Sequence, residues 1–240
     1  MTESWSKADI HMHTTHSDGT ARVYEVLAHV ARHTDVRVIA ITDHDTIEGA
    51  LEAQQMADAY GIDVIVGEEV STADGHLLAL FIEHELPPRR PAAETIAAVH
   101  AQGGLCIAAH PYGMLVPSMG YAGLPQRCIG PEPEWPLDAI EGFNASLWLP
   151  RNNKVAAQIG ATLGLPLCGG SDSHHLATIG MGYTLFPGHT AADLRRAIQA
   201  GQTQAAGISW GWRCVAEFAR RRSARWLWAI ARRGWGLSPS

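Results

Sequence analysis

The chain lacks the features that would place it in a membrane or outside the cell. Nowhere do about 18 consecutive apolar residues occur, the length that crosses a bilayer as a helix. No basic segment followed by an apolar one opens the sequence, so no secretory leader is indicated. The four cysteines include no C-x-x-C pair, which argues against a disulfide framework and a cysteine zinc site. We therefore expect a cytoplasmic protein in a reducing compartment.

Positive charge is scarce over most of the chain. The formal net charge is −6, but residues 210–240 hold seven arginines and a single glutamate, which leaves −12 for the preceding 209 residues. So acidic a main body argues against a nucleic-acid groove. An anionic substrate would be met there by metal cations instead of by a basic patch.

Strand-like and helix-like segments alternate along the chain, a pattern that predicts an α/β fold with a parallel sheet. About seven parallel strands favour a closed barrel over an open sheet, and 240 residues suit one barrel domain, expected over 1–209. The Gly- and Pro-rich connection 112–137 is expected to be irregular and to lie where barrels hold substrate-selecting loops. The expected strands are 8–13, 36–43, 62–71, 76–82, 105–110, 138–143, 166–171 and 182–186, and the expected helices are 20–33, 45–60, 91–102, 152–164 and 190–200.

Side chains that bind metals stand at the ends of five predicted strands. The first strand contains His11 and His13, and residues two apart in a strand share a face, so both can bind one metal. Asp18 follows as an oxygen ligand, and His44 ends the second strand. Beside His44, Asp43 is either a ligand or a residue that orients a histidine, and Asp45 alternatively caps the next helix.

The other three of these five strands end in the same kind of residue. The third ends in Glu68 and Glu69, of which alternation lets only one face inward, and His76 opens the fourth. His110 ends the next strand, and Asp172 and His174 end the one at 166–171. Each of these histidines taken singly also fits a structural role, but five strands that end alike indicate one shared site. Mixed imidazole and carboxylate ligands suit Zn, Mn or Fe better than Mg or Ca.

Together these motifs resemble the PHP (polymerase and histidinol phosphatase) family over residues 8–201. They occur in family order: H-x-H-T-x-x-S-D-G from His11, T-D-H at His44, G-x-E-x-S followed by a histidine, A-H-P at His110, and G-S-D-x-H near the end. The resemblance implies a distorted (β/α)7 TIM-like barrel, the PHP fold, that holds two or three divalent metal ions. It also selects Glu69 over Glu68, because Glu69 is the third residue of G-x-E.

The resemblance implies three sets of metal ligands. They are His11, His13, Glu69 and Asp172; Glu69, His76 and His110, with Glu69 bridging; and Asp18, His44 and His174. All nine positions hold ligating side chains, which favours a competent enzyme over a degenerate domain. The catalytic residues are expected to be His11, His13, Glu69, Asp172 and His174. The subdomain that some family members insert after the fourth strand is missing here, which leaves the substrate open.

The activity that this resemblance implies is hydrolysis of a small phosphorylated metabolite or nucleotide. A water that bridges two metals would attack phosphorus, and the third metal, His16 or His175 would assist the leaving oxygen. For these two histidines, a role in supporting the ligands or simple exposure to solvent is the commoner explanation. Arg22, Arg151 and Lys154 follow strand ends and are candidate phosphate clamps, although surface cations on helices are the commoner explanation of such residues.

Two other functional classes are kept beside this one. The same metal chemistry supports hydrolysis of a non-phosphorus ester or amide, and a metal-stabilised binding domain is the third class. The tail 210–240 interleaves five tryptophans with seven arginines. This tail is either a basic amphipathic helix for an anionic membrane surface or partner, or a terminal helix that packs on the barrel. The sequence predicts no oligomeric state.

Overall fold

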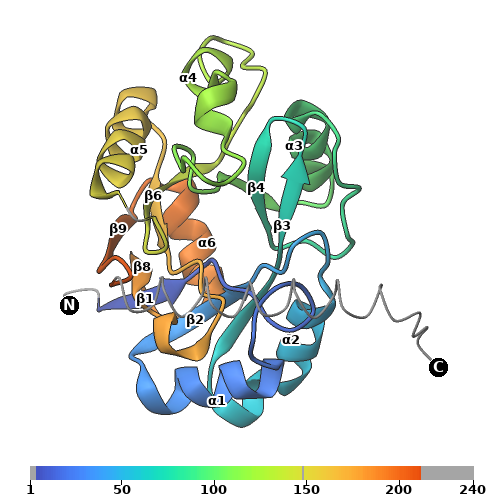
Figure 1. Ribbon diagram of the computed structural model, residues 1–240, viewed down its shortest axis with the longest axis vertical. Coiled ribbons are helices and arrows are strands. Elements are labelled where there is room, and N and C mark those ends of the chain that lie inside the picture. Colours follow the sequence, from blue (N-terminus) through green and yellow to red (C-terminus); the bar gives the residue numbers. More distant parts are fainter. Residues whose placement is uncertain (1–3, 148, 212–240) are drawn as a thin grey trace, which may run out of the picture.

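The computed structural model describes residues 4–147 and 149–211 as a mixed α/β fold with a nearly closed, barrel-shaped sheet (Figure 1). In this part of the chain the sheet has nine strands in the order β7-β6-β5-β4-β3-β2-β1-β8-β9. Near its open edge, β7 contacts β8 and β9, and Met12 forms a bridge with Ser173. The predicted fold class is therefore confirmed.

The strands alternate between two apolar layers because neighbouring residues in a strand face opposite ways. In β2, Ile39 and Ile41 belong to the layer shared with α1 and α2, whereas Val38 and Ala40 belong to the layer shared with α6. The two layers hold the sheet between helices and leave the strand ends to carry polar residues. The strands are β1 (Trp5–Asp9), β2 (Val36–Ile41), β3 (Asp63–Thr72), β4 (Gly75–Leu80), β5 (Leu105–Ala108), β6 (Ala139–Asn144), β7 (Leu167–Gly170), β8 (Gly182–Pro187) and β9 (Gln204–Gly207).

Six α-helices and two short 3-10 helices connect these strands in the described residues. The longer ones follow the predicted positions within a few residues, and α4 with η1 interrupts the connection 112–137 that was expected to be irregular. The helices are α1 (Val23–His33), α2 (Glu48–Tyr60), α3 (Ala92–Ala101), η1 (Met119–Ala122), α4 (Leu124–Arg127), α5 (Pro150–Leu163), η2 (Leu176–Thr178) and α6 (Ala191–Gln199). None of them combines the length and the apolar character needed to cross a bilayer.

The expectation of an all-parallel barrel is wrong in detail. Strand β4 runs antiparallel to β3 and β5, and β8 runs antiparallel to β1 and β9. Thr72 pairs with Gly75, so only two residues join β3 to β4, and a parallel crossover needs a dozen or more. The sequence also gave no signal for β9. The predicted tail begins within the described residues, but residues 212–240 lie outside them.

Glycines let β7 and β8 approach each other closely where the barrel nearly closes. A Cβ atom added to Gly182 in β8 would overlap the backbone carbonyl of Gly170 in β7, and one on Gly169 would overlap the carbonyl of Tyr183. Backbone carbonyls cannot move aside as side chains can. The contact between β7 and β8 therefore depends on the absence of side chains at these positions.

The substitution Gly182→Ala tests this close contact. We expect it to lower the free energy of unfolding by about 1–3 kcal/mol, because the added methyl group forces the two strands apart. Urea denaturation measures the change. Gly211→Ala is the control, since no described atom would lie within 4 Å of its Cβ, and we expect it to change stability by about 0.5 kcal/mol or less. Equal stability of the two variants would contradict this account of barrel closure.

Candidate metal centre

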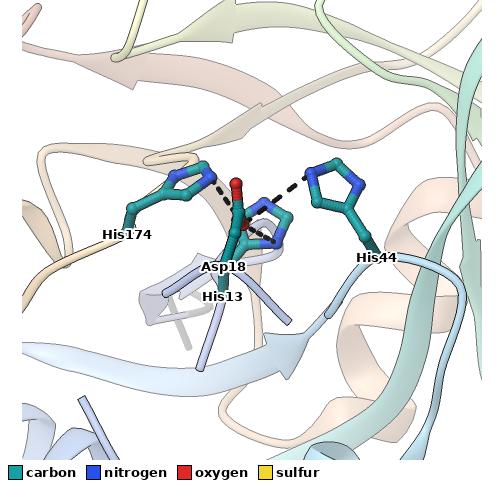
Figure 2. A group of neighbouring side chains, drawn as sticks. All are labelled: His13, Asp18, His44 and His174. Carbon is teal, nitrogen blue, oxygen red and sulfur yellow. Dashed lines mark ion pairs between the residues drawn. The ribbon is translucent and has the colours of Figure 1, made fainter. Parts of the chain in front are cut away.

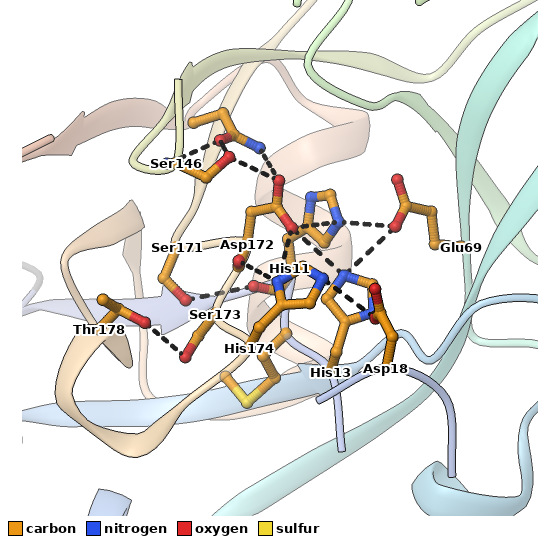
Figure 3. A network of polar contacts seen from close by, with 12 residues as sticks. His11, His13, Asp18, Glu69, Ser146, Ser171, Asp172, Ser173, His174 and Thr178 are labelled. Atoms are coloured by element: carbon orange, nitrogen blue, oxygen red, sulfur yellow. Dashed lines mark hydrogen bonds and ion pairs between the residues drawn. The ribbon is translucent and has the colours of Figure 1, made fainter. Parts of the chain in front are cut away.

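All nine predicted ligands lie together at one end of the barrel, and the fold explains why. The parallel strands β1, β2, β5 and β7 deliver the residues that follow their carboxyl ends to this edge. Because β4 runs the opposite way, its first residues, including His76, reach the same edge. Strand β1 ends at Asp9, earlier than predicted, so His11 and His13 lie beyond it, yet both rings still point to the shared site (Figure 3).

Glu69 lies at the centre of the cluster and is 1% exposed. Its Oε2 is 3.2 Å from His11 Nε2 and 3.3 Å from His13 Nε2. Its Oε1 is 2.8 Å from both His76 Nδ1 and His110 Nε2. The two oxygens of one carboxylate thus face two different sets of histidines.

Two further carboxylates complete the cluster. Asp172 Oδ1 is 3.3 Å from His13 Nε2 and 3.6 Å from His11 Nε2, on the side of Glu69 Oε2. Figure 2 shows the other group, in which Asp18 Oδ1 is 3.1 Å from His174 Nε2 and 3.9 Å from both His44 Nε2 and His13 Nδ1, so His13 belongs to both groups. Within each group the ligand atoms lie within 4.8 Å of one another, close enough to share an ion.

Two of these residues adopt a backbone conformation that side chains rarely take. The φ angle is 26° at His110 and 51° at Asp172. Such strained backbone persists only where neighbouring contacts fix it, and it concentrates at functional sites. Ser118 Oγ donates to His110 O at 3.0 Å, and Ser146 Oγ donates to the Asp172 side chain at 2.7 Å.

The charges of the cluster offset one another. Burial lowers the pKa of His13, but the carboxylates of Asp172 and Glu69 beside its ring outweigh burial and raise that pKa to about 10. Burial would raise the pKa of Glu69, but the nearby histidines hold it well below its ordinary value. Burial and nearby histidines lower the pKa of His44, which favours the neutral imidazole that metals bind.

The donor set fits divalent metal ions. Six imidazoles and three carboxylates converge, and buried nitrogens such as His11 Nε2 and His13 Nε2 have no hydrogen-bond partner among the described residues. A buried polar atom without a hydrogen bond is costly, and a cation between such nitrogens and the carboxylates would satisfy both.

Asp43 and Asp45 support the site in ways that the sequence did not indicate. Among the described residues Asp43 makes no hydrogen bond with a histidine side chain: its carboxylate accepts hydrogen bonds from Thr14 N (2.7 Å), Thr14 Oγ1 (2.6 Å) and Ser17 Oγ (2.6 Å), which fixes the turn before Asp18. Asp45 is not a helix cap, since α2 begins after Ile47; its Oδ1 instead accepts a hydrogen bond from Ser71 N in β3 at 2.7 Å. Sequence reasoning also gave no role to Glu141, a buried carboxylate inside the apolar strand β6 that contacts His11.

The residues proposed to bind phosphate or to transfer a proton are not among the nine clustered ligands. Arg22, Arg151 and Lys154 are exposed, and in the described part of the chain none of them makes a hydrogen bond or ion pair with the nine ligands. Their role stays a prediction. His16 contacts Glu52 and Glu48 on α2 (2.9 and 3.4 Å). The other spare histidine, His175, is buried, and its ring lies 5.4 Å from that of Trp210.

Glu68, next to Glu69, faces away from the cluster. Its Oε2 accepts a hydrogen bond from Leu86 N at 3.1 Å. Burial raises its pKa from 4.5 to about 8. A carboxyl group with this pKa is largely protonated at neutral pH, and it has no histidine partner in the residues described.

Glu68→Gln tests this assignment through the pH dependence of stability. The folded state keeps a proton that the unfolded state releases above pH 4.5, so the wild-type free energy of unfolding falls as the pH rises toward about 8. Glutamine has no such proton, and we expect the variant to show a flatter decline. Urea denaturation between about pH 5 and 8 measures both profiles. Parallel profiles would contradict the raised pKa.

Two family models match this chain. One, described as the PHP domain, matches residues 9–122, and another, described as PHP-associated, matches residues 150–203. An uncharacterized protein of Methanocaldococcus jannaschii is 33% identical over 150 residues, which cover 58% of this chain and 82% of that protein.

Two relatives with named activities match shorter regions. A 5'-3' exoribonuclease of Haemophilus influenzae is 47% identical over 66 residues, 28% of this chain and 24% of that protein. A phosphoribosyl 1,2-cyclic phosphate 1,2-diphosphodiesterase of Eggerthella lenta is 35% identical over 85 residues, 33% of this chain and 32% of that protein. The chain thus spans a third or less of both relatives.

A solved structure shares the fold. The crystal structure of a two-domain protein from Bacteroides vulgatus, described as containing a predicted PHP-like metal-dependent phosphoesterase, superposes with a TM-score of 0.70 at 20% identity. The match covers 86% of this chain and 66% of that one.

Proposed function

The chain belongs to the PHP domain family of metal-dependent phosphoesterases, and we propose that it hydrolyses a small phosphorylated metabolite or nucleotide with two or three divalent metal ions. The proposed ligands are the nine clustered residues. His11, His13, Glu69 and Asp172 would hold one ion. Glu69, His76 and His110 would hold a second, and Asp18, His44 and His174 a third.

The geometry of Glu69 carries this proposal. One of its oxygens lies 3.2–3.3 Å from two histidines of the first set, and the other lies 2.8 Å from both histidines of the second. A carboxylate divided in this way between two groups of ligands is suited to bridge two ions. Bound divalent metals supply Lewis-acid activation of the phosphoryl group and of water.

The chain's own residues prepare the site for an anionic substrate. Ser146 and Asn144 hold Asp172 Oδ2 at 2.7 and 3.2 Å, which leaves Oδ1 directed at His11 and His13. The side chains of Asp18 and His44 are 39% and 28% exposed, whereas those of His11 and His13 are fully buried. A phosphoryl group would therefore reach the cluster from the side of Asp18 and His44.

The proposed metals are Mn, Zn or Fe. Six imidazole nitrogens with three carboxylates form a mixed donor set, and Mg and Ca prefer all-oxygen sites. The same donors suit all three proposed ions, so reconstitution with each is part of the experiment below.

The connection 112–137 borders the cluster, which supports its predicted role in substrate selection. Its Pro117 O accepts a hydrogen bond from His76 N at 3.2 Å, and Ser118 holds the backbone of His110. Just before Pro117 in the chain, Met114 and Leu115 are 66% and 92% exposed. Exposed apolar residues a few positions after His110 in the chain suit contact with the organic part of a substrate. The nuclease and phosphodiesterase names of two relatives support assays of a diester beside a monoester.

Metal reconstitution tests the proposed function. Chelator-treated protein should lose hydrolysis of a generic aryl phosphate or aryl phosphodiester and regain it with at least one of Mn, Zn and Fe. His11→Ala and Asp172→Ala should abolish the restored turnover, because each removes a ligand from the first set. The assay is release of the aryl alcohol over time.

His33→Ala is the matched control, since this histidine is exposed at the end of α1 and contacts none of the nine residues in the described structure. It should keep wild-type turnover. Metal-dependent cleavage of a carboxylic ester but of neither phosphoester would favour the ester or amide hydrolase. Stoichiometric metal binding without any turnover would favour the binding domain.

A further inference from the structure

A buried carboxylate that belongs to none of the three ligand sets lies directly behind two of them. Glu141 in β6 is 0% exposed. Its Oε1 is 3.1 Å from His11 Nδ1, and its Oε2 accepts hydrogen bonds from the backbone N of His110 at 2.6 Å and from Asn144 Nδ2 at 2.9 Å. One side chain thus touches a proposed ligand of the first metal and the backbone of a proposed ligand of the second.

We propose that Glu141 is the positioning residue of this centre: it holds a proton on His11 Nδ1, so that Nε2 faces the metal, and it fixes the backbone of His110. This inference rests on the proposed metal centre. It implies that metal binding depends on a tenth residue, Glu141, which is not itself a ligand.

The chemistry of the contact with His11 sets the position of the proton. A carboxylate can only accept a hydrogen bond, so the imidazole nitrogen that faces Glu141 must carry the hydrogen. The opposite nitrogen, His11 Nε2, faces Glu69 Oε2 at 3.2 Å and Asp172 Oδ1 at 3.6 Å. That nitrogen is the one that would bind a cation, and a histidine whose other nitrogen donates to a carboxylate is a more basic, better oriented ligand.

The second contact explains how His110 keeps its unusual backbone. With φ at 26°, this residue is strained, and the bond from its N–H to Glu141 Oε2 is one of the contacts that hold it. The ring can then place Nε2 at 2.8 Å from Glu69 Oε1. Glu141 therefore contacts His11 and His110 on the side away from the proposed ions, at His11 Nδ1 and His110 N. Glu69 contacts the same two residues at the nitrogens that would bind the ions.

The neighbouring strand leaves room for this pair. A Cβ atom on Gly170 would lie 2.5 Å from His11 Cβ and 2.7 Å from Glu141 Oε1. Any side chain at position 170 would push His11 and Glu141 apart. The glycine that ends β7 is thus explained by the contact between these two residues.

Glu141→Gln separates positioning from a structural role. Two donors point at the Oε2 position, so the glutamine oxygen would occupy it and keep the bonds to His110 and Asn144. The amide NH₂ would then face His11 Nδ1 as a donor, which requires an unprotonated Nδ1 and places the proton on Nε2. A purely structural Glu141 would tolerate this change, whereas a positioning residue would not.

The measurement is Zn²⁺ affinity by competition with a chromophoric chelator, together with ¹⁵N NMR of the histidine rings in Zn²⁺-saturated protein. We expect Glu141→Gln to weaken Zn²⁺ binding about 10–100-fold, with His11 Nε2 protonated and unbound. In the wild type, Nε2 should bind Zn²⁺ and Nδ1 should carry the proton. Circular dichroism of both proteins checks that the fold is retained.

Glu68→Gln is the matched control, because Glu68 is equally buried in the same sheet but contacts no histidine among the described residues. It should bind Zn²⁺ like the wild type. Wild-type affinity and an Nε2-bound His11 in Glu141→Gln would overturn this inference while leaving the proposed metal centre intact. A wild-type protein that binds no Zn²⁺, Mn²⁺ or Fe²⁺ would instead overturn the proposed function itself.

Discussion

The burial of Glu69 and Asp172 is the constraint on which this end of the molecule depends. Both carboxylates are almost inaccessible to water, and both remain ionised because the surrounding histidines hold their pKa values well below the ordinary range. Ionised carboxylates in a protein interior need compensating positive charge. The architecture supplies it either as protons on imidazoles or as metal ions in the same place, so metal binding here must release protons.

Mixed strand directions make this concentration of charge achievable. Parallel strands alone bring the residues at their carboxyl ends to one edge, as β2 does for His44 and β7 for Asp172. The antiparallel β4 adds His76 from an amino end, directly across from Ser71 of β3. A single sheet edge thus gathers ligands from strands that run both ways, which an all-parallel barrel could not do with this order of residues.

The fold class and the nine clustered residues could be predicted from the sequence, because each residue belongs to a short motif near a strand end and the order of these motifs resembles that of one family. Sequence reasoning missed what depends on pairing across the sheet. The direction of β4 follows from a two-residue turn, and the role of Asp43 follows from its contact with Thr14 and Ser17 in another segment. Glu141 gave one signal, a carboxylate inside an apolar strand, but its partner His11 is 130 positions away in the chain.

Glu68 and Glu69 show why residue type alone does not assign a site. They are consecutive, chemically identical and both buried in β3, yet the pKa of one is raised to about 8 and that of the other is held well below normal. The difference comes from the two faces of the strand: one face meets Leu86 and nearby acids, and the other meets five histidines. Alternation along a strand shows that two neighbouring side chains face opposite sides of the sheet. Which of the two stays negatively charged depends on the side chains packed against each side.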